Sequence, residues 1–364
     1  MKPGNQLLTS VLFWIIAFCL FGFFRFYGLD EAPEIQLNVD LVRFPWPILV
    51  VVGAITGLLY ELIERRLRTR RFLQERPYWV TLAFKPLIYG FLALVITVIA
   101  GIVLNRFLYQ KVNWQQVWEA ATGKMFMVML VFFLVTSFVI SFLQIIRQYF
   151  GDRVLLNLVT GKYSRPFEEY RIFMFLDMRS STTIAEDLGT IQYSRFVQDC
   201  FRDFTGVIEQ HRPEVYQYVG DEVVLTWLPE VGLTNFNCIH TCYTFNQILQ
   251  SRKEYYLQEY GVVPVFKAGA HIGRVRVAEI GVIRRDIAYH GDVMNTTARI
   301  QSQCNSLGYD LLISEALWKE LPKRTEGLVF KPVADVTLKG KEFSVNLVGV
   351  ETPGEFANAD SGLS

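Results

Sequence analysis

The sequence predicts an N-terminal α-helical membrane domain with four spans, followed by a C-terminal α+β domain. Long apolar runs occur within residues 1–146 and no comparable run follows, whereas strand-like and helix-like segments alternate from residue 171 onward. The composition agrees with this division. A chain that is 51% hydrophobic and 20% charged is too apolar for an ordinary soluble enzyme and too charged for a purely membrane-embedded protein.

The membrane domain is expected over residues 1–146, because four apolar runs each approach the roughly 20 residues that a bilayer core requires. These runs cover residues 7–24, 44–60, 86–104 and 125–146. The first run is predicted to be a retained span rather than a signal peptide. Lys2 is the only charged side chain before it, and bulky residues follow where a small-residue cleavage site would lie.

The orientation of the spans follows from the connection "ERRLRTRRFLQER" after the second run. It carries the arginines Arg65, Arg66, Arg68, Arg70, Arg71 and Arg76. Basic loops stay in the cytoplasm, so we expect an inner or plasma membrane protein with both termini cytoplasmic. An arginine run can also bind nucleic acid, but the net charge of +1 gives no global basic field. We therefore expect a lipid bilayer as a partner, with anionic lipid near the arginines, and no nucleic acid.

The five cysteines are scattered along the chain. Cys238 and Cys242 lie one helical turn apart, and no second pair at zinc-ligand spacing accompanies them. This pattern predicts free thiols rather than a metal site or a disulfide framework, and it places the C-terminal half in a reducing compartment.

Residues 147–170 are expected to form an amphipathic linker that continues the fourth span and breaks at Gly161 and Pro166. The folded C-terminal domain is expected over residues 171–350, with a disordered tail at 351–364. Within the domain we expect strands at 171–177, 214–219, 222–228 and 265–280, helices at 190–211, 236–260 and 292–307, and closing segments at 310–321 and 336–350.

Two acidic positions suggest a metal site in this domain. Asp177 ends the apolar strand "RIFMFL", and Asp221 lies with Glu222 at the tip of the hairpin "VYQYVGDEVVLTW". Each has an ordinary structural explanation, a strand-end cap for Asp177 and turn chemistry for Asp221. If the strand and hairpin are neighbours in one sheet, the two carboxylates converge, and carboxylates together with substrate phosphates are how magnesium is usually held.

A hydroxyl-rich loop follows Asp177 and opens the next helix. Backbone N–H groups in such a loop can hold phosphates. The predicted substrate-binding residues here are Met178, Arg179, Ser180, Ser181 and Thr182. Further along, "GDVMNTTARIQ" places Asn295 and Arg299 on one helical face. Such a pair is often only a solvated face, but arginine can also stabilise a phosphoryl transition state while asparagine orients a hydroxyl.

The order "FMFLDMRSST … YQYVGDEVVL … YHGDVMNTTARI … LKGK" resembles the catalytic domain of class III nucleotidyl cyclases, the adenylate and guanylate cyclase family. The resemblance covers roughly residues 150–350 and implies a ferredoxin-like, palm-type fold. It implies that Asp177 and Asp221 bind two Mg²⁺ or Mn²⁺ ions. It also implies that Asn295 orients the ribose and Arg299 stabilises the α-phosphoryl group in flight.

The same resemblance makes Lys339 in "LKGK" the triphosphate-binding lysine, with Lys341 as the alternative. It implies a homodimer, because in the family the aspartates come from one domain and the asparagine and arginine from another. Glu222 receives no role from the resemblance and is interpreted as structural.

Two positions depart from the family pattern. Adenylate cyclases typically carry a base-reading lysine where this chain has Gln217, and Asp or Thr where it has Ala288. Guanylate-specific members carry Glu and Cys there, so the chain matches neither pair. Because an amide both donates and accepts hydrogen bonds, Gln217 could meet either purine. We expect conversion of ATP to cyclic AMP and pyrophosphate, with a guanylate or relaxed-specificity cyclase as the alternative.

Three rival interpretations remain. A diguanylate cyclase also has a Gly-Asp-Glu hairpin, but the second Gly and the Phe of its motif are missing, and the helix with Asn295 and Arg299 counts against it. A membrane receptor with a non-catalytic, nucleotide-binding domain is a second alternative. A transporter or channel is disfavoured, because the spans contain almost no charge near their middle.

Overall fold

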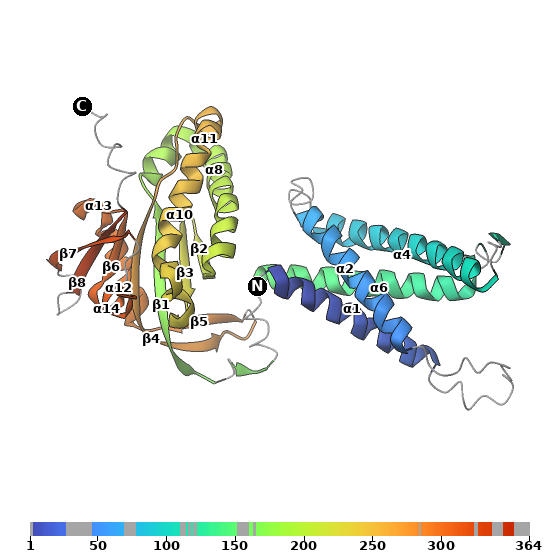
Figure 1. Cartoon of the computed structure of the whole chain (residues 1–364). Helices are drawn as coiled ribbons and strands as arrows, with labels where there is room; N and C mark the ends of the chain where they lie inside the picture. Colours follow the sequence, from blue (N-terminus) through green and yellow to red (C-terminus); the bar gives the residue numbers. More distant parts are fainter. Residues whose placement is uncertain are drawn as a thin grey trace. The chain divides into compact units, whose positions relative to one another are not determined.

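The structure is a computed structural model. It describes residues 3–26, 46–68, 78–109, 114–115, 118, 122–150, 160–162, 165–283, 285–323, 327–336 and 345–352. The chain divides into two compact units, Met1–Asp152 and Arg153–Ser364 (Figure 1). Each unit is considered by itself below.

In its described residues, the first unit contains four long helices, and each includes nearly all of one predicted apolar run. These are α1 (Pro3–Phe26), α2 (Trp46–Arg68), α4 (Tyr78–Tyr109) and α6 (Lys124–Phe150). In the described part of the chain, one segment, Phe126–Ile146, is long and apolar enough to cross a membrane, with a mean hydropathy of 2.7. Shorter apolar helical stretches cover Leu7–Phe23 and Leu82–Leu92. The helices are therefore where the sequence predicts them, while the four-span arrangement stays a prediction.

Glycines allow α1 and α2 to pack closely. A Cβ atom at Gly53 would lie 2.7 Å from the Cα atom of Ile15, and one at Gly57 would lie 2.6 Å from the Cα atom of Val11. Small residues four apart let helix backbones approach in this way, and the arrangement is common between membrane helices. Aromatic side chains fill the interior of the bundle: Trp14, Phe18, Tyr60, Tyr89 and Phe133.

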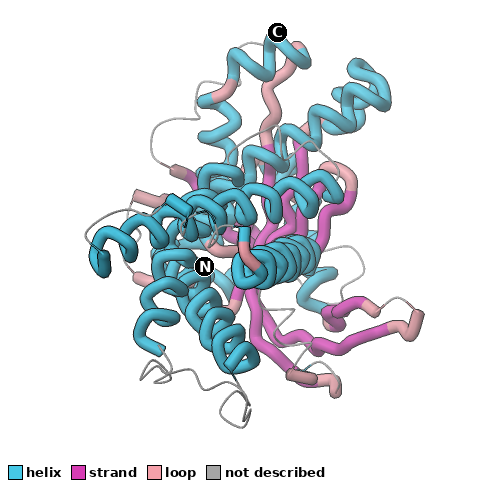
Figure 2. The backbone as a smooth tube through the Cα atoms, turned by 90° about the vertical axis from the view of Figure 1, so that its right-hand side faces the viewer, coloured by secondary structure: helices cyan, strands magenta, loops and turns pink. Residues whose placement is uncertain are grey.

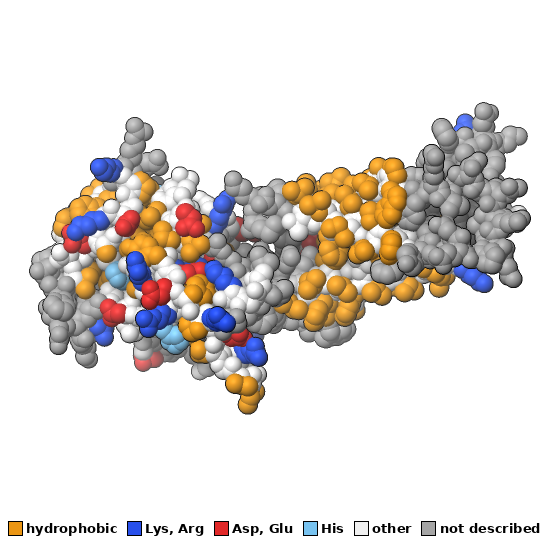
Figure 3. Space-filling model, turned by 90° about the horizontal axis from the view of Figure 1, so that it is seen from below, with side chains coloured by type: hydrophobic (Ala, Val, Ile, Leu, Met, Phe, Trp, Pro, Cys, Tyr) orange, Lys and Arg blue, Asp and Glu red, His pale blue; other side chains and the backbone are white. Residues whose placement is uncertain are grey.

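The outer surface of the helical unit is apolar. Hydrophobic side chains cover much of the face seen in Figure 3. The exposed residues include Ile16, Leu62, Leu87, Phe91, Val131 and Val135. Exposed apolar surface of this extent is typical of a surface that contacts lipid or another protein.

A buried polar cluster joins three of the four helices. The Nζ atom of Lys85 on α4 donates to Oε1 of Glu64 on α2 at 2.6 Å and to Oε1 of Gln144 on α6 at 3.2 Å. The hydroxyl of Tyr89 donates to the other oxygen of Glu64 at 3.2 Å. The charged pair lies near the end of α2 and the start of α4, just outside the predicted spans. It is consistent with the expectation of little charge near the middle of the bundle.

The strands of the second unit form one eight-stranded sheet in the order β2-β3-β1-β4-β6-β8-β7, with β5 paired to β4. The first four strands are β1 (Phe167–Met178), β2 (Glu214–Val219), β3 (Glu222–Trp227) and β4 (Phe266–Ile280). The others are β5 (Asp286–His290), β6 (Leu311–Ser314), β7 (Val329–Val336) and β8 (Val345–Glu351). The β4–β6 pair is parallel and the other pairs are antiparallel. This mixed sheet fits the predicted α+β domain.

Helices connect the strands and cover the sheet. The longer ones are α8 (Ser181–His211), α10 (Asn237–Ser251), α11 (Lys253–Tyr260) and α12 (Asp292–Ser302). The short ones are α9 (Pro229–Gly232), η4 (Thr234–Phe236), α13 (Cys304–Leu307) and α14 (Glu315–Glu320). Figure 1 shows α8 and α10 lying along the sheet, and Figure 2, with strands in magenta, shows some strands extending away from the others at the lower right.

The two faces of the sheet have separate apolar cores, because alternate side chains of β1 point to opposite faces. Ile172 and Leu176 belong to a large core that includes residues of α8 and α10, such as Phe204. Phe173 belongs to a smaller cluster with Val293 of α12. The face covered by α12 is the one on which the candidate site lies.

Several predicted boundaries need correction. The first strand begins at Phe167 rather than at 171, and Pro166 lies directly before it. The helix predicted at 190–211 is preceded by a further helical segment that begins at Ser181, and the two meet at a kink at Gly189, whose φ of 70° and ψ of 165° are not helical. The helix predicted at 236–260 is broken near Arg252. Lys339 and Lys341 lie outside the described residues, as does most of the predicted tail.

The cysteines agree with the sequence interpretation. All five are free, and the four in the second unit are buried. The side chains of Cys242 and Cys304 lie against backbone carbonyl groups inside the sheet domain. They pack as small core residues.

Candidate active site

The pairing of β1 with β3 brings the two predicted aspartates to one edge of the sheet. Asp177 lies opposite Glu222 in the antiparallel ladder, and Asp221 directly precedes Glu222 in the β2–β3 turn. The turn includes Gly220 at a φ of 64°, a left-handed conformation that glycine adopts at less cost than other residues. The predicted hairpin is confirmed, and so is the neighbourhood of its tip to the end of the first strand.

Asp177 has two partners from neighbouring elements. Nε2 of Gln301 on α12 donates to Oδ2 of Asp177 at 2.9 Å, and Nζ of Lys267 on β4 lies 3.5 Å from the same oxygen. Burial and the charge of Asp221 raise the pKa of Asp177 above its ordinary value, and Lys267 and Gln301 oppose this rise. The carboxylate is thus fixed in direction while its charge is only partly compensated.

Asp221 is less well satisfied. Its Oδ2 atom is buried and has no hydrogen-bond partner. A buried carboxylate oxygen without a partner costs free energy, and the binding of a cation would offset that cost. The hydroxyl of Tyr193 on α8 lies close by, and burial together with the charge of Asp221 raises the pKa of Tyr193 to about 12. The oxygen is therefore suited to a cation that enters with a ligand.

Glu222 lies in the same electrostatic environment. Residues directly opposite each other in a ladder point to the same face, so the Glu222 side chain shares a face with Asp177. Burial, followed by the charges of Asp177 and Asp221, raises the pKa of Glu222 to about 7. The sequence interpretation of Glu222 as merely structural did not anticipate this crowding of acidic groups.

The loop after β1 leads directly into α8. Met178 is buried, and the backbone N–H of Arg179 donates to the carbonyl of Val265 at 2.8 Å. The guanidinium of Arg179 forms an ion pair with Asp310 at 2.7 Å. The other three predicted substrate-binding residues lie at the start of α8: Ser180, Ser181 and Thr182. Backbone N–H groups at a helix start lack intrahelical partners and can hold an anion.

The predicted base-reading positions lie on two different strands. Gln217 is exposed on β2, directly after a β-bulge that follows Val215. Ala288 is buried in the middle of β5, opposite Ala278 of β4. A bulge re-aims the side chains of the strand that carries it, and bulges are common beside active sites.

Asn295 and Arg299 lie on α12 but away from the aspartates. Thr297 and Ile300 are buried on this helix, whereas Asn295 is exposed. Gln301, the residue that contacts Asp177, is two positions beyond Arg299, and residues two apart on a helix do not share a face. Within the described part of the chain, no hydrogen bond or ion pair joins Asn295 or Arg299 to either aspartate. The two sets of predicted residues do not meet in one chain.

Three residues at the aspartates were missed from the sequence. Lys267 is a lone charge in the otherwise apolar start of β4, and that interruption was the signal that could have revealed it. Gln301 and Tyr193 gave no comparable signal. Their role depends on how α12 and α8 pack, which the local pattern does not specify.

The match to a known protein family covers the part of the chain that contains these residues. The family model described as the adenylate and guanylate cyclase catalytic domain matches residues 163–349. The chain therefore belongs to the family of class III nucleotidyl cyclases.

Curated relatives carry the same domain. Adenylate cyclase 2 of Rhizobium meliloti (strain 1021) is 33% identical over 192 residues, which are 53% of this chain and 53% of the relative. The adenylate cyclase of Anabaena cylindrica is 23% identical over 184 residues, 49% of this chain and 36% of the relative. The chain thus spans about half the length of the first of these relatives, and less of the second.

Among solved structures, a bacterial light-regulated adenylyl cyclase aligns with a TM-score of 0.53 at 18% identity. The alignment covers 65% of this chain and 68% of that one. At this identity the likeness shows the fold alone.

Proposed function

We propose that this chain is a membrane-bound adenylate cyclase that converts ATP to 3′,5′-cyclic AMP and pyrophosphate for intracellular signalling. One observation carries the proposal: Asp177 and Asp221 converge beside the start of α8, and the buried Oδ2 of Asp221 has no partner. The names of the curated relatives, which are adenylate cyclases, support the same activity.

The donor set fits divalent metal ions. No group of three or more acidic, histidine or cysteine side chains in the described residues is arranged as a metal site. Two carboxylates completed by substrate phosphates suit Mg²⁺ or Mn²⁺, and two such ions would be held by Asp177 and Asp221. When bound, the ions neutralise the triphosphate and acidify the ribose 3′-hydroxyl. Gln301 and Lys267 hold Asp177 in place for this role.

The reaction needs the second set of residues as well. The ribose 3′-hydroxyl loses its proton to water and its oxygen attacks the α-phosphorus to form a new P–O bond. The bond from the α-phosphorus to the oxygen that bridges it to the β-phosphate breaks, so that pyrophosphate leaves. Arg299 stabilises the negative charge on the transferring group, and Asn295 orients the ribose. Because neither contacts the aspartates of its own chain, a homodimer with two shared sites follows. Lys339 or Lys341 would bind the triphosphate.

ATP is the proposed substrate, with weaker discrimination against GTP than a lysine and aspartate pair would give. The side chain of Ala288 offers no hydrogen bond, and the Gln217 amide can serve either purine. A guanylate or relaxed-specificity cyclase is the second candidate, and these two residues are the observation that favours it.

The membrane attachment is proposed from the four helices, their exposed apolar side chains and the arginines of the segment 65–76. We infer four spans with both termini in the cytoplasm. A reporter fused after residue 364 and one inserted near residue 70 should both report the cytoplasmic side. An external signal from either reporter contradicts the topology.

A nucleotide-specific product assay on the full-length protein in membranes tests the activity. With Mn²⁺ and ATP we expect cyclic AMP and pyrophosphate in equal amounts, and slower product formation from GTP. A strict preference for GTP would show that the base site is wrongly assigned. Nucleotide binding without any product would instead favour the non-catalytic receptor.

A further inference from the structure

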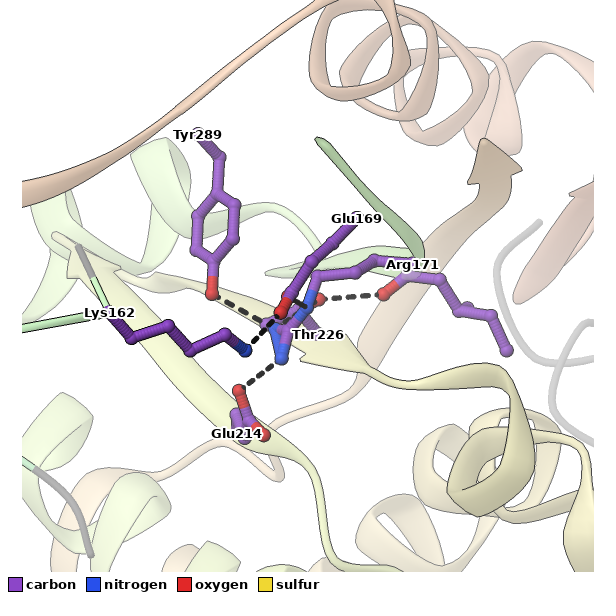
Figure 4. A network of polar contacts seen from close by, with 7 residues as sticks. Lys162, Glu169, Arg171, Glu214, Thr226 and Tyr289 are labelled. Carbon is purple, nitrogen blue, oxygen red and sulfur yellow. Dashed lines mark hydrogen bonds and ion pairs between the residues drawn. The ribbon is translucent and has the colours of Figure 1, made fainter. Parts of the chain in front are cut away.

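A buried charge network lies on the same face of the sheet as the aspartates, at the other end of β1 (Figure 4). The Arg171 cluster, as we name it, consists of Lys162, Glu169, Arg171, Glu214, Thr226 and Tyr289. Arg171 is at its centre and is only 3% exposed. An arginine buried in a strand is rare unless it is paired.

The guanidinium of Arg171 is held on three sides. Nε donates to Oε2 of Glu169 at 2.9 Å, Nη2 donates to Oε2 of Glu214 at 2.6 Å, and Nη1 donates to the Tyr289 hydroxyl at 2.9 Å. Lys162 donates to the second oxygen of Glu169 at 2.8 Å. Two cations and two carboxylates balance one another. Burial raises the pKa of Glu169, but Lys162 and Arg171 outweigh burial and hold that pKa below its usual value.

Two arms of the cluster reach the strands that carry the base-reading positions. Glu214 begins β2, three residues before Gln217, and Tyr289 directly follows Ala288 on β5. The Tyr289 ring packs edge-on against Tyr216, the residue between Val215 and Gln217 at the bulge, with 5.0 Å between ring centroids. Arg171 therefore grips both strands close to these positions.

The position of β5 depends on the contacts made by Arg171. Its backbone ladder in the described residues runs only along β4, so it has no strand on its other side. Side-chain contacts connect it to the rest of the domain: the Arg171–Tyr289 hydrogen bond, and the packing of the Tyr289 ring against Phe173 at 5.3 Å. A strand held along one edge can shift more easily than one held along both, so a bridge from β1 fixes where β5 lies.

We propose that Arg171 is a positioning residue for the nucleobase: through Glu214 and Tyr289 it fixes Gln217 and Ala288 relative to each other and so sets the affinity for ATP over GTP. The inference rests on the proposed function, in which these two positions face the purine. Within the described residues, the hydrogen bonds and ion pairs of Arg171 go to Glu169, Glu214, Thr226 and Tyr289 and not to the aspartates or α12, so we expect it to act on recognition and not on the chemical step.

The sharpest probe is Tyr289→Phe in the full-length protein, because it keeps the ring and removes only the hydroxyl that Arg171 holds. We expect KM for ATP to rise about threefold to tenfold, because one charge-assisted hydrogen bond is lost. The ATP-to-GTP ratio of kcat/KM should fall. The kcat for ATP should stay close to the wild-type value. Arg171→Lys, which keeps the charge but loses the fork, should act in the same direction.

The double variant tests whether the two residues act together. If Tyr289 acts through Arg171, Arg171→Lys with Tyr289→Phe should raise KM no further than Arg171→Lys alone. Arg276→Lys is the matched control, because Arg276 is an exposed arginine of the neighbouring strand β4, paired to Glu168 at 3.3 Å. It should leave KM and the nucleotide ratio unchanged.

Two results would overturn the proposal. One is a lowered melting temperature with unchanged KM and nucleotide ratio, which is the behaviour of a purely structural cluster. The other is a fall in kcat at constant KM. Binding of 3′-deoxy-ATP and 3′-deoxy-GTP, which lack the attacking hydroxyl, is measured by calorimetry in parallel. If the wild type makes no product the proposed activity fails, and the ratio of these affinities still decides the role of Arg171.

Discussion

Buried charges are paired differently toward the two ends of β1. At one end, Arg171 meets two carboxylates and a tyrosine hydroxyl, and Lys162 completes the balance. At the other end, Asp177 and Asp221 lie together, Lys267 is the cation paired to Asp177 among the described residues, and one oxygen of Asp221 has no hydrogen-bond partner. The two regions lie on the same face of the same sheet, so burial alone does not explain the difference.

The difference separates a positioning role from a ligand-binding role. A satisfied network holds strands in place and gains nothing from an added ion. Crowded acidic groups repel one another when no cation is bound, and this repulsion lowers the stability of the free protein. The same repulsion favours the binding of a cation, because the cation relieves it. Incomplete pairing, more than burial, marks the candidate active site.

The largest expected effect comes from breaking the incompletely paired end. Asp221→Ala should lower cyclase activity about 10³-fold or more, because it weakens the binding of metal ions that supply several kcal/mol of transition-state stabilisation. It should not lower the melting temperature, because the side chain it removes has an unsatisfied buried oxygen. Asp187→Ala, an exposed acid on α8, is the matched control. Near-normal activity in Asp221→Ala would return the hairpin tip to turn chemistry.

The second effect tests whether the site is shared between two chains. Asp221→Ala and Arg299→Ala should each be inactive alone. Co-expressed, they form mixed dimers in which one site collects both damaged residues and the other is intact. Random mixing makes half of the dimers mixed, so about a quarter of the wild-type activity should return. The assay is cyclic AMP formation by the co-purified variants.

That experiment also has a clear failure. If the variants associate in a pull-down and the mixture stays inactive, the shared-site proposal is wrong. The four groups would then have to act within one chain. That would require α12 to turn, because Arg299 and Gln301 lie on different sides of it.

Much of the fold was predictable because its signals are local. The hairpin arms at 214–219 and 222–228 follow from β-branched and aromatic residues around a glycine turn, and the sheet edge with Asp177 and Asp221 follows from them. The start of α8 was not predictable in the same way. The residues before the predicted start at 190 form a further helical segment from Ser181, which meets the predicted helix at a kink at Gly189. That first segment depends on tertiary packing, which local propensity does not contain.

Residues that act through long-range contacts were also missed. Arg171 was taken as the first residue of a strand, and nothing near it in the sequence identifies Tyr289, 118 positions away, as its partner. Lys267 and Gln301 reach Asp177 from separate elements in the same way. The chemistry-bearing residues lie in motifs, whereas the residues that orient them are defined only by the completed sheet.

The smallest expected effect sharpens the comparison through pH. Burial and the two aspartates raise the pKa of Glu222 to about 7, from an ordinary value of 4.5. The folded protein then holds this proton more tightly than the unfolded chain. The contribution is fully present below the unfolded pKa and is lost as pH rises from about 4.5 to about 7.

In EDTA, the apparent melting temperature of the wild type should therefore fall between pH 5 and pH 7 by more than that of Glu222→Gln, which does not titrate. The corresponding difference in the free energy of unfolding should be roughly 1 kcal/mol. This is less than the pKa shift alone implies, because the Glu222 side chain is partly exposed and solvent screens its charge. Saturating Mg²⁺ should abolish the difference, since bound cations offset the repulsion that raises the pKa. Glu169→Gln should not imitate Glu222→Gln, because the pKa of Glu169 is lowered by its cations. Parallel pH profiles for wild type and Glu222→Gln in EDTA would mean that the acids at this edge do not repel one another, and the contrast between the two ends of β1 would be lost.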